Sequence, residues 1–590
     1  MGVQGAKPGA PKVRSARGGV WGSAPILNDP CMNGLASPRM PSGIAAAFAQ
    51  ADDLLAAGQM AAAARIFHDI LAADPRHADS RHRLGVIALS TGEAGAALAA
   101  FDAALALRPR ASIFHDSRGD ALEALDRKDE AIAAWRTAIR LDPRAVAPLV
   151  SLGGALARSD DKPAREEAVQ CFRRALALDP AAFPAQYGLG LALKDLRRPA
   201  EAEAALRAAL SLVPDHAAVH STLGDVLREM GRLEAAAASL ATALRLAPGD
   251  HGARIGLARL HMTAERFEAA EALLRGVLAE APGNAAVHLL LALLLLGNGR
   301  YAEGWEHYEW RIEAVGKTPE LSGPTWNGSD LAGRTLLVNA DEGFGDFIHF
   351  CRFIPLAAKQ GRVVVRAALP LLRLVLWMDG VAQAVPRGAP LPAFDVHCSA
   401  NSLPRAFRAG TQPIPADIPY LRADPADVAD WRARLAVLPG RKVGLVWAGN
   451  PEQSVDPVRS MPLSSLAPLA GMAGMSFVSL QKGGRPDPRA GLLLQDWTDE
   501  LLDFADTAAL VENLDLVIAV DTAVAHLAGA LGRPVWLLNR WDGDTAPFWL
   551  RGREESPWYP TMRIFRQRRA RDWDEVLLRV RAALADWLAA

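Results

Sequence analysis

Residues 76–109 read RHADSRHRLGVIALSTGEAGAALAAFDAALALRP, and this stretch decides the fold of the first half of the chain. It contains small, small, bulky, small and proline positions in that order, at Gly85, Ala97, Phe101, Ala104 and Pro109. Small residues let two helices approach closely, and a proline stops the second helix. The stretch therefore predicts a pair of packed helices.

The same order of residues recurs along the chain with a period of 34. The period is marked by prolines at Pro75, Pro109, Pro143, Pro180, Pro214, Pro248 and Pro282, with one interval of 37. Because one such unit cannot bury its apolar faces alone, we expect about eight units stacked over residues 44–318. We expect the bulky position to fill the space between successive units. A longer turn near 159–163 is expected to absorb the three extra residues. A generic alanine-rich helical array is the alternative.

Composition excludes several classes of protein. The chain has 590 residues, of which 50% are hydrophobic and 22% charged, so wholesale disorder and a collagen-like fibre are excluded. Its 65 basic and 66 acidic side chains leave a net charge of -1, so no excess positive field holds nucleic acid or anionic lipid. The longest aliphatic run, Leu289–Leu296, is far shorter than the roughly 20 residues that span a bilayer. We expect neither a nucleic-acid partner nor a membrane span.

The N-terminus and the cysteines indicate a cytoplasmic protein. Residues 1–43 are rich in Gly, Pro and Ser and have no apolar stretch, which predicts a disordered tail rather than a secretory signal. Met32 and Met40 are alternative starts of translation. The four cysteines are scattered without a C-x-x-C pair, which argues against a disulfide framework or a structural zinc site.

After residue 318 the helical periodicity gives way to short apolar runs. These runs are Leu336–Val338, Val363–Val365, Val443–Trp447, Phe477–Leu480, Leu514–Val520 and Val535–Leu538. Such runs are typical of parallel strands that are covered on both faces. We predict an α + α/β multidomain chain, in which an α-solenoid is followed by a linker (319–333) and two Rossmann-like doubly wound halves (334–438 and 439–590). A ligand is expected in the cleft at the carboxyl ends of the strands.

The first candidate loop follows the first strand of the α/β region and includes Gly343, Gly345 and Asp346. The two glycines would allow a tight turn and a close approach of a ligand, and Asp346 would open the next helix. A plain helix N-cap is the alternative for Asp346. The loop lacks the third glycine of a dinucleotide fingerprint, so a hydride-transfer enzyme is excluded.

The second candidate site begins where a buried strand runs into an alanine-rich helix at Asp521. The free amides of Thr522, Ala523 and Val524, together with the helix dipole, are suited to a phosphate. His526 lies just over one turn further on and is expected to face the same pocket. The alternative is a well-capped helix with a core histidine.

The third cluster lies on the loops after the first strands of the second half. Asn450 follows one strand, Arg459 lies further along the same loop, and Gln481 and Lys482 follow the next strand. Arg459 and Lys482 would neutralise a leaving phosphate without a metal. Solvent-facing salt bridges are the alternative for both residues.

Together with Ser556–Pro560 and Arg563–Gln567, these loops resemble bacterial tetratricopeptide proteins fused to a GT-B glycosyltransferase domain. That domain is similar to the heptosyltransferases and, more distantly, to O-linked N-acetylglucosamine transferases. The resemblance covers nearly the whole chain after residue 43. It implies that Asp346 is a general base and that Asp521, Thr522, Ala523 and His526 bind the nucleotide phosphates. It also makes the first half the acceptor side and the second half the nucleotide-sugar side.

The resemblance implies a metal-independent protein O-glycosyltransferase with a CMP- or UDP-linked sugar as donor. Its acceptor would be a Ser or Thr of a protein held on the concave face of the repeats. Similar proteins glycosylate flagellin with a nonulosonic acid such as pseudaminic acid. The chain departs from the family pattern in two places. Many relatives carry Trp-Arg-Trp where this chain has 539–549, and Arg459 replaces a lysine.

Two other functions are compatible with the sequence. One is a non-catalytic repeat scaffold, in which the α/β region is a degenerate GT-B module used for docking or sugar sensing. The other is sugar transfer to a glycan or a lipid instead of a protein.

Overall fold

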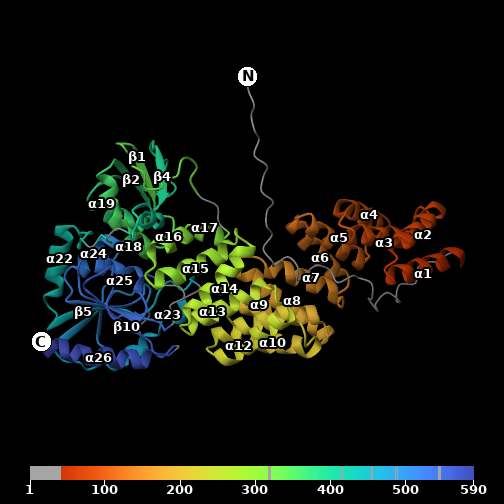
Figure 1. Cartoon of the computed structure of the whole chain (residues 1–590). Helices are drawn as coiled ribbons and strands as arrows, with labels where there is room; N and C mark the ends of the chain where they lie inside the picture. Colours follow the sequence, from red (N-terminus) through yellow and green to blue (C-terminus); the bar gives the residue numbers. More distant parts are fainter. Residues whose placement is uncertain are drawn as a thin grey trace, which may run out of the picture. The chain divides into compact units, whose positions relative to one another are not determined.

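The computed structural model describes residues 42–316, 320–411, 414–415, 417–453, 456–484, 487, 490–541, 547–569 and 571–589. The chain forms two compact units that divide between Ala253 and Arg254, and Figure 1 labels the elements of both. The expected disordered tail, residues 1–43, lies outside the described residues except for Ser42 and Gly43, which begin the first helix.

Antiparallel helix pairs make up the repeat region, and the described residues contain eight of them. They are α1 (Ser42–Ala56) with α2 (Met60–Ala73), α3 (Ala78–Ser90) with α4 (Ala94–Leu107), α5 (Ser112–Ala124) with α6 (Lys128–Leu141), α7 (Val146–Ala157) with α8 (Lys162–Leu178), α9 (Phe183–Asp195) with α10 (Pro199–Leu212), α11 (Ala217–Glu229) with α12 (Leu233–Leu246), α13 (His251–Thr263) with α14 (Phe267–Glu280), and α15 (Ala285–Gly297) with α16 (Tyr301–Tyr308). A short helix, α17 (Arg311–Ala314), follows.

The bulky residue of a repeat packs against the small residue of the same helix pair. A Cβ atom at Gly85 would lie 2.5 Å from Cε1 of Phe101, and one at Gly190 would lie 2.7 Å from Cγ of Leu206. Only glycine allows the two helices to come this close. The expectation that the bulky side chain lies between successive units is therefore wrong for these pairs, because the side chain occupies the space inside its own unit.

The three extra residues of the fourth repeat lengthen a helix. α8 spans 17 residues, whereas α6 and α10 each span 14. Asp161 caps α8 by accepting a hydrogen bond from the Ala164 amide, and Pro163 lies in the first turn. Both features favour an earlier helix start. The turn itself, 158–161, is only one residue longer than the turns 125–127 and 196–198, so the predicted longer turn accounts for little of the change and the longer helix α8 accounts for most of it.

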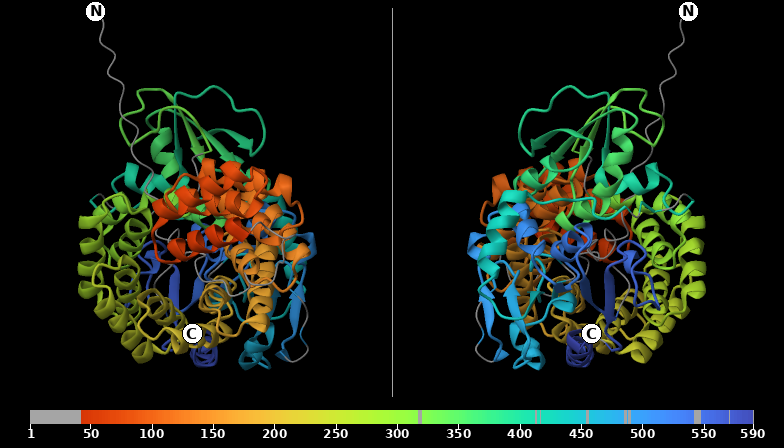
Figure 2. Two further views of the ribbon diagram at one scale, coloured as in Figure 1. Left: turned by 90° about the vertical axis from the view of Figure 1, so that its right-hand side faces the viewer. Right: turned by 90° about the vertical axis from the view of Figure 1, so that its left-hand side faces the viewer.

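The first α/β sheet has four parallel strands in the order β3-β2-β1-β4. The strands are β1 (Thr335–Asn339), β2 (Arg362–Ala367), β3 (Val381–Pro386) and β4 (Val396–Ser399). Leu336 and Val338 of β1 belong to one buried cluster and Leu337 to another, so both faces of this strand are covered. Figure 2 shows these green strands as a group separate from the blue strands of the second sheet.

The second sheet has six parallel strands in the order β10-β9-β8-β5-β6-β7. The strands are β5 (Arg441–Val446), β6 (Met475–Ser479), β7 (Leu494–Asp496), β8 (Leu516–Val520), β9 (Val535–Asn539) and β10 (Met562–Arg566). The strand order reverses between β5 and β8, which is where ligands bind in open α/β sheets. The predicted fold class, a helical repeat region followed by two parallel α/β halves, is confirmed.

The last helix pair shares a buried core with the α/β halves inside the second unit. Trp305 and Tyr308 of α16 lie in the same cluster as Val338 of β1 and Val517 of β8. The segment expected as a linker also packs here, because Trp326 is buried and its amide donates to the carbonyl of His397. The α/β region therefore does not fold around its own residues alone.

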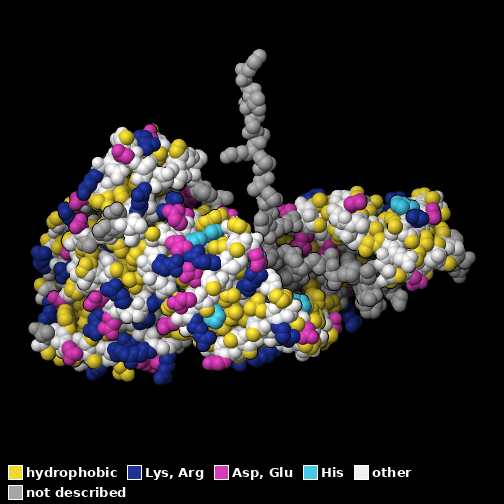
Figure 3. Space-filling view, in the orientation of Figure 1, with side chains coloured by type: hydrophobic (Ala, Val, Ile, Leu, Met, Phe, Trp, Pro, Cys, Tyr) yellow, Lys and Arg dark blue, Asp and Glu magenta, His cyan; other side chains and the backbone are white. Residues whose placement is uncertain are grey.

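The surface and the helices give two further facts. On the face drawn in Figure 3, basic and acidic side chains are interspersed over the second unit. Among the helices that the structure describes, none combines the length and the apolar character needed to cross a membrane.

Candidate functional site

The loop after β1 leads into α18 (Phe344–Phe350), which contains the predicted base. Gly343 is the N-cap of this helix, and its amide donates to the carboxylate of Asp346 in the first turn. A Cβ atom at Gly343 would lie 2.8 Å from Oδ2 of Asp346, so a side chain at this position would crowd the carboxylate. The sequence predicted that Asp346 opens this helix. The prediction is wrong, because Gly343 is the N-cap and Asp346 is the third residue of the helix.

The strand β8 leads into α25 (Ala523–Ala530), the second predicted site. Thr522 is the N-cap, but its hydroxyl donates to the carbonyl of Val520 at 3.2 Å and does not cap the helix. The first amides of a helix have no partner within the helix. The amides of Ala523 and Val524 are therefore the groups best placed to receive an anion at this end of α25.

These two loops come together. A Cβ atom at Gly345 would lie 3.4 Å from Cα of Ala523 and 3.2 Å from Cδ2 of His526. The helices α18 and α25 pack against each other and are drawn side by side in Figure 1. The charge of Asp521 also acts on Asp346. The loops at the carboxyl ends of β1 and β8 therefore lie next to each other, and Asp346 lies beside the start of α25.

Arg459 joins the third predicted loop to this place. It is the last residue of α23 (Asp456–Arg459), and its guanidinium donates to the carbonyl of Asp521 at 3.0 Å and to Oε1 of Gln453 at 3.0 Å. A side chain at Gly449 would collide with this guanidinium. Arg459 therefore lies flat against the loop after β5 and contacts the end of β8.

Gln481 has a structural contact at the same edge of the sheet. Its Oε1 accepts hydrogen bonds from the amides of Trp447 at 3.2 Å and Ala448 at 2.8 Å. This contact fixes the loop after β5 to the loop after β6. Gln481 is therefore a support of the loop that precedes Asn450.

Asn450 and Lys482 are exposed and lie at the margin of the predicted site. The side chain of Asn450 accepts from the amide of Glu452 in its own turn, and the ammonium of Lys482 donates to the carbonyl of Leu501. No contact recorded for the described residues joins either side chain to Asp346 or Thr522. Their predicted roles in phosphate binding stay predictions.

Asp346 titrates far from its ordinary range. Burial raises its pKa from 3.8 to about 7, and the negative charges of Glu342 and Asp521 add to this increase. The Gly343 amide and the charge of Arg311 oppose it. The sequence alone indicates an ordinary carboxylate that is fully ionised at neutral pH, and the enclosed position changes this. A pKa near the working pH suits a group that both accepts and releases a proton.

His526 is a buried core residue. Its Nδ1 lies 3.0 Å from the hydroxyl of Tyr559 and 3.1 Å from Nδ1 of His349, and its Nε2 lies 3.8 Å from Oδ1 of Asp521. Burial lowers the pKa of His526 to about 4 and holds that of His349 well below its ordinary value. Both rings are therefore neutral. Of the two ring nitrogens of His526, Nε2 is the one that faces Asp521.

A buried polar network that the sequence did not reveal surrounds these histidines. The hydroxyl of Tyr420 donates to the carbonyl of Ile348 at 2.9 Å and lies 3.2 Å from that of Tyr559. Arg352 donates to the carbonyl of Trp558 at 2.8 Å and lies over the Tyr559 ring. The only sequence signals were the position of His349, one turn after Asp346, and the Ser-Pro-Trp-Tyr-Pro stretch.

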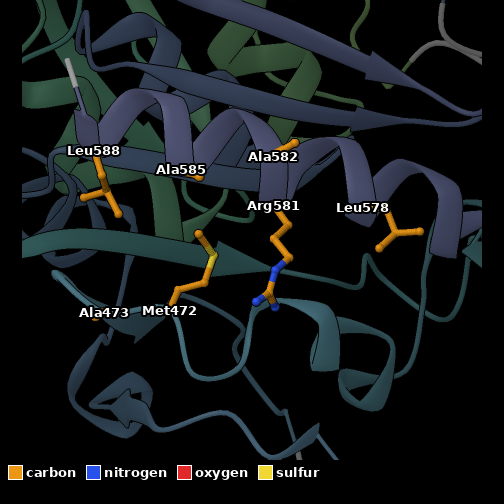
Figure 4. A pocket seen from close by; sticks show the side chains of 7 residues that line it. All are labelled: Met472, Ala473, Leu578, Arg581, Ala582, Ala585 and Leu588. Atoms are coloured by element: carbon orange, nitrogen blue, oxygen red, sulfur yellow. The ribbon is translucent and has the colours of Figure 1, made fainter.

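A cavity of ≈ 530 Å³ opens elsewhere, against α26 (Trp573–Ala589). Leu578, Arg581 and Leu588 line it from the helix, and Met472 lies opposite them in Figure 4. It contains none of the predicted site residues. The guanidinium of Arg581 donates to the carbonyl of Pro468.

Two sequence predictions receive no test from the geometry. The segment 539–549, where the family pattern is broken, includes 542–546, which lie outside the described residues. Among the residues that the structure does describe, no group of three or more His, Cys, Asp or Glu is arranged to hold a metal ion. A reaction without metal stays a prediction.

Family models match both parts of the chain. Tetratricopeptide repeat models match residues 48–112, 117–183, 164–217, 187–251, 227–294 and 263–304. The model of glycosyltransferase family 9 (heptosyltransferase) matches residues 501–538, a segment that contains β8, all of α25 and β9 except its last residue.

Known proteins match parts of the chain. Protein FlbA of Caulobacter vibrioides is 31% identical over 330 residues, which is 50% of this chain and 54% of FlbA, so the match spans about half of that relative. Among solved structures, Pseudomonas aeruginosa pilF matches 35% of this chain and 92% of its own, with 21% identity and a TM-score of 0.32. The tetratricopeptide protein TTC0263 of Thermus thermophilus matches 31% of this chain and 98% of its own, with 28% identity and a TM-score of 0.27.

The chain therefore combines tetratricopeptide repeats with a heptosyltransferase-like α/β region. This confirms the resemblance that the sequence motifs indicated. It defines a glycosyltransferase-like repeat protein.

Proposed function

We propose that the protein is a glycosyltransferase that moves a sugar from a nucleotide-sugar donor to a Ser or Thr hydroxyl of a protein, without a metal ion. The close approach of Gly345 to Ala523 carries the proposal, because it brings a carboxylate next to a helix start suited to a phosphate. The family 9 match supports the same function, since it includes that helix start.

In this reaction Asp346 acts as the general base. The hydroxyl oxygen of the acceptor bonds to the anomeric carbon, and its proton passes to the carboxylate of Asp346. The bond from the anomeric carbon to the phosphate oxygen breaks, and the electron pair leaves with the phosphate. The amides of Ala523 and Val524 and the charge of Arg459 stabilise the leaving group. The donor is a CMP- or UDP-linked sugar.

The repeats hold the acceptor protein on their concave face, and the reaction takes place in the cytoplasm. Tetratricopeptide arrays present extended concave surfaces, which suit a protein ligand. Flagellin modified with a nonulosonic acid is the acceptor and product that the family resemblance favours. Intact-mass analysis of flagellin from cells with and without the protein tests this assignment. An unchanged mass discards flagellin as the acceptor and leaves the transferase proposal standing.

Donor binding is the direct test of the enzyme. Calorimetry with CMP- and UDP-linked sugars is expected to find one that binds and is slowly hydrolysed. A general base typically contributes 10²- to 10⁴-fold, so Asp346→Ala is expected to reduce transfer by about that factor while donor binding is kept. Asp341→Asn removes a carboxylate from the same loop, where Ser399 donates to it, and is the matched control. Near-normal turnover of Asp346→Ala removes Asp346 from the mechanism.

A non-catalytic scaffold is the second candidate, and the contacts of Arg459 favour it. Both terminal nitrogens of its guanidinium already donate to protein oxygens, those of Asp521 and Gln453. A cation committed to the protein is less free to neutralise a phosphate. If calorimetry finds no nucleotide-sugar that binds, the result supports the scaffold.

Transfer to a glycan or lipid is tested with the whole chain. Deleting the repeats is not a clean test, because Trp305 and Tyr308 of α16 belong to the core of the α/β region. We therefore compare full-length protein on protein, glycan and lipid acceptors. Equal or faster transfer to the small acceptors contradicts the protein acceptor.

A further inference from the structure

Arg311 is a buried arginine at the start of α17, directly after the last helix pair of the repeats. Only 6% of its side chain is exposed. Its Nε lies 2.5 Å from Oε1 of Glu342, one terminal nitrogen lies 3.1 Å from Oε1 of Glu309, and the other donates to the hydroxyl of Ser402 at 3.1 Å. Every nitrogen of the guanidinium therefore has an oxygen partner.

Glu342 connects this arginine to the predicted site. It lies in the loop after β1, four residues before Asp346 in the first turn of α18. Burial raises the pKa of Glu342, and the charge of Arg311 opposes that increase. Arg311 is therefore the cation that favours an ionised Glu342 in an enclosed place.

Three charged groups act on Asp346. Glu342 acts from its own loop, Asp521 from the β8–α25 junction and Arg311 from α17. The charge of Asp346 acts in turn on the hydroxyl of Tyr308 in α16, which burial keeps neutral. Two carboxylates oppose the ionisation of Asp346, and one guanidinium favours it. The balance depends on a residue that the repeat region supplies.

We propose that Arg311 is a positioning residue of the site: it holds Glu342 in place, and through this pair it sets the charge around Asp346. The inference rests on the proposed function, in which Asp346 is the base. It means that the repeat region supplies a residue to the transferase site in addition to holding the acceptor. The hydrogen bonds to Glu309 and Ser402 fix the orientation of the guanidinium.

The test is the pH dependence of transfer in four variants of the full chain. On the acid side, transfer rises with pH as Asp346 loses its proton, and this part of the pH profile is called the acid limb. Glu342→Gln removes a negative charge, so the acid limb is expected to move to lower pH by about one unit. Arg311→Gln removes the positive charge and also the partner that favours an ionised Glu342, so Glu342 takes up a proton and the limb is expected to lie near that of the double variant. Arg311→Gln combined with Glu342→Gln brings the limb back near its original position, because the two charges cancel. Arg311→Lys keeps the charge and leaves the limb in place.

This pattern separates positioning from a structural role. A merely structural arginine predicts that the limb of the double variant coincides with that of Glu342→Gln, which overturns the proposal. Near-ultraviolet circular dichroism checks the fold of each variant. If Arg311→Gln alone does not fold, the comparison of Glu342→Gln with the double variant still tests the proposal. The double variant also lacks Arg311, so its acid limb must lie at higher pH than that of Glu342→Gln.

A second readout does not depend on turnover. The carbonyl band of the protonated Asp346 carboxyl is assigned in the infrared spectrum as the band lost in Asp346→Asn, and its titration is followed in the same four variants. If no donor is turned over but the titration moves as described, the charge relationship stands and the transferase proposal falls. If transfer is measured and neither the limb nor the band moves, the role of Arg311 is wrong.

Discussion

The Nδ1 atoms of His349 and His526 lie 3.1 Å apart, and the hydroxyl of Tyr559 lies within 3.2 Å of both. His349 belongs to α18, which follows β1 of the first sheet, and His526 belongs to α25, which follows β8 of the second. The two halves of the α/β region are therefore joined at this point by buried hydrogen bonds in addition to apolar contacts. Because unpaired buried polar groups are costly, this junction is sensitive to the loss of a single hydroxyl.

Tyr559→Phe is expected to lower the free energy of unfolding by about 1–3 kcal/mol, because the substitution leaves histidine nitrogens without their partner. Urea denaturation monitored by tryptophan fluorescence measures the change. Tyr187→Phe is the matched control, since the Tyr187 hydroxyl lies 3.5 Å from both of its partners and contributes little. Equal losses in the two variants contradict the hydrogen-bonded junction.

The sequence predicted the strands that are covered on both faces. β1, β2, β5, β6, β8 and β9 all contain short, mainly apolar runs, because each face of these strands packs in a core. It missed the four edge strands, which are β3, β4, β7 and β10. Gln383 of β3 is exposed, and β7 has only three residues. Strands at a sheet edge need no continuous apolar run, so their sequences carry little signal.

The sequence also located the site better than it described its chemistry. Asp346 follows β1 of the first sheet and Thr522 follows β8 of the second, and two doubly wound halves place the carboxyl ends of their strands along a shared cleft. The contact of Arg311 with Glu342 and that of His349 with Tyr559 join residues 31 and 210 positions apart, and no local pattern marks them. The raised pKa of Asp346 depends on burial, which follows only from the packed structure.

Asp346→Asn is expected to change how stability depends on pH. The folded protein holds the proton of Asp346 up to about pH 7, whereas the unfolded chain releases it near 3.8. Between these values the folded state binds more protons, so the contribution of Asp346 to stability falls as pH rises, by up to about 1.4 kcal/mol per pH unit. Asp346→Asn has no carboxyl group to titrate, so this loss of stability with rising pH is absent from the variant.

Thermal unfolding of wild type and Asp346→Asn at pH 5, 6, 7 and 8 measures the difference. The variant is expected to gain stability relative to wild type from pH 5 to pH 7, and the gap is expected to level off above pH 7. Asp341→Asn is the control and should show no such trend. A constant gap between wild type and Asp346→Asn at all four pH values means that Asp346 has an ordinary pKa.

Gly345→Val is expected to disturb both stability and transfer. A single Cβ atom at Gly345 already lies at 3.4 Å from the backbone of Ala523, so a branched side chain forces α18 and α25 apart. We expect a loss of about 1–3 kcal/mol and a large fall in activity. Gly276→Ala is the control, because a Cβ atom there meets nothing within 4 Å in a helix interior, where alanine is favoured over glycine. Normal transfer by Gly345→Val contradicts the shared site.

Trp305→Ala tests whether the last helix pair belongs to the α/β core. Trp305 is 1% exposed, and its ring stacks on Phe548 at 6.1 Å and meets the edge of Phe350 at 5.7 Å. Its truncation is expected to cost about 3–5 kcal/mol, because the cavity opens against both halves. Hydrogen exchange measured by mass spectrometry should show faster exchange in peptides from β1 and β8. Trp135→Ala, an equally buried tryptophan in the first unit, is the control and should leave these peptides protected. If hydrogen exchange in the β1 and β8 peptides is equally slow in both variants, α16 is not part of that core. The repeat region then cannot supply a rigidly held Arg311.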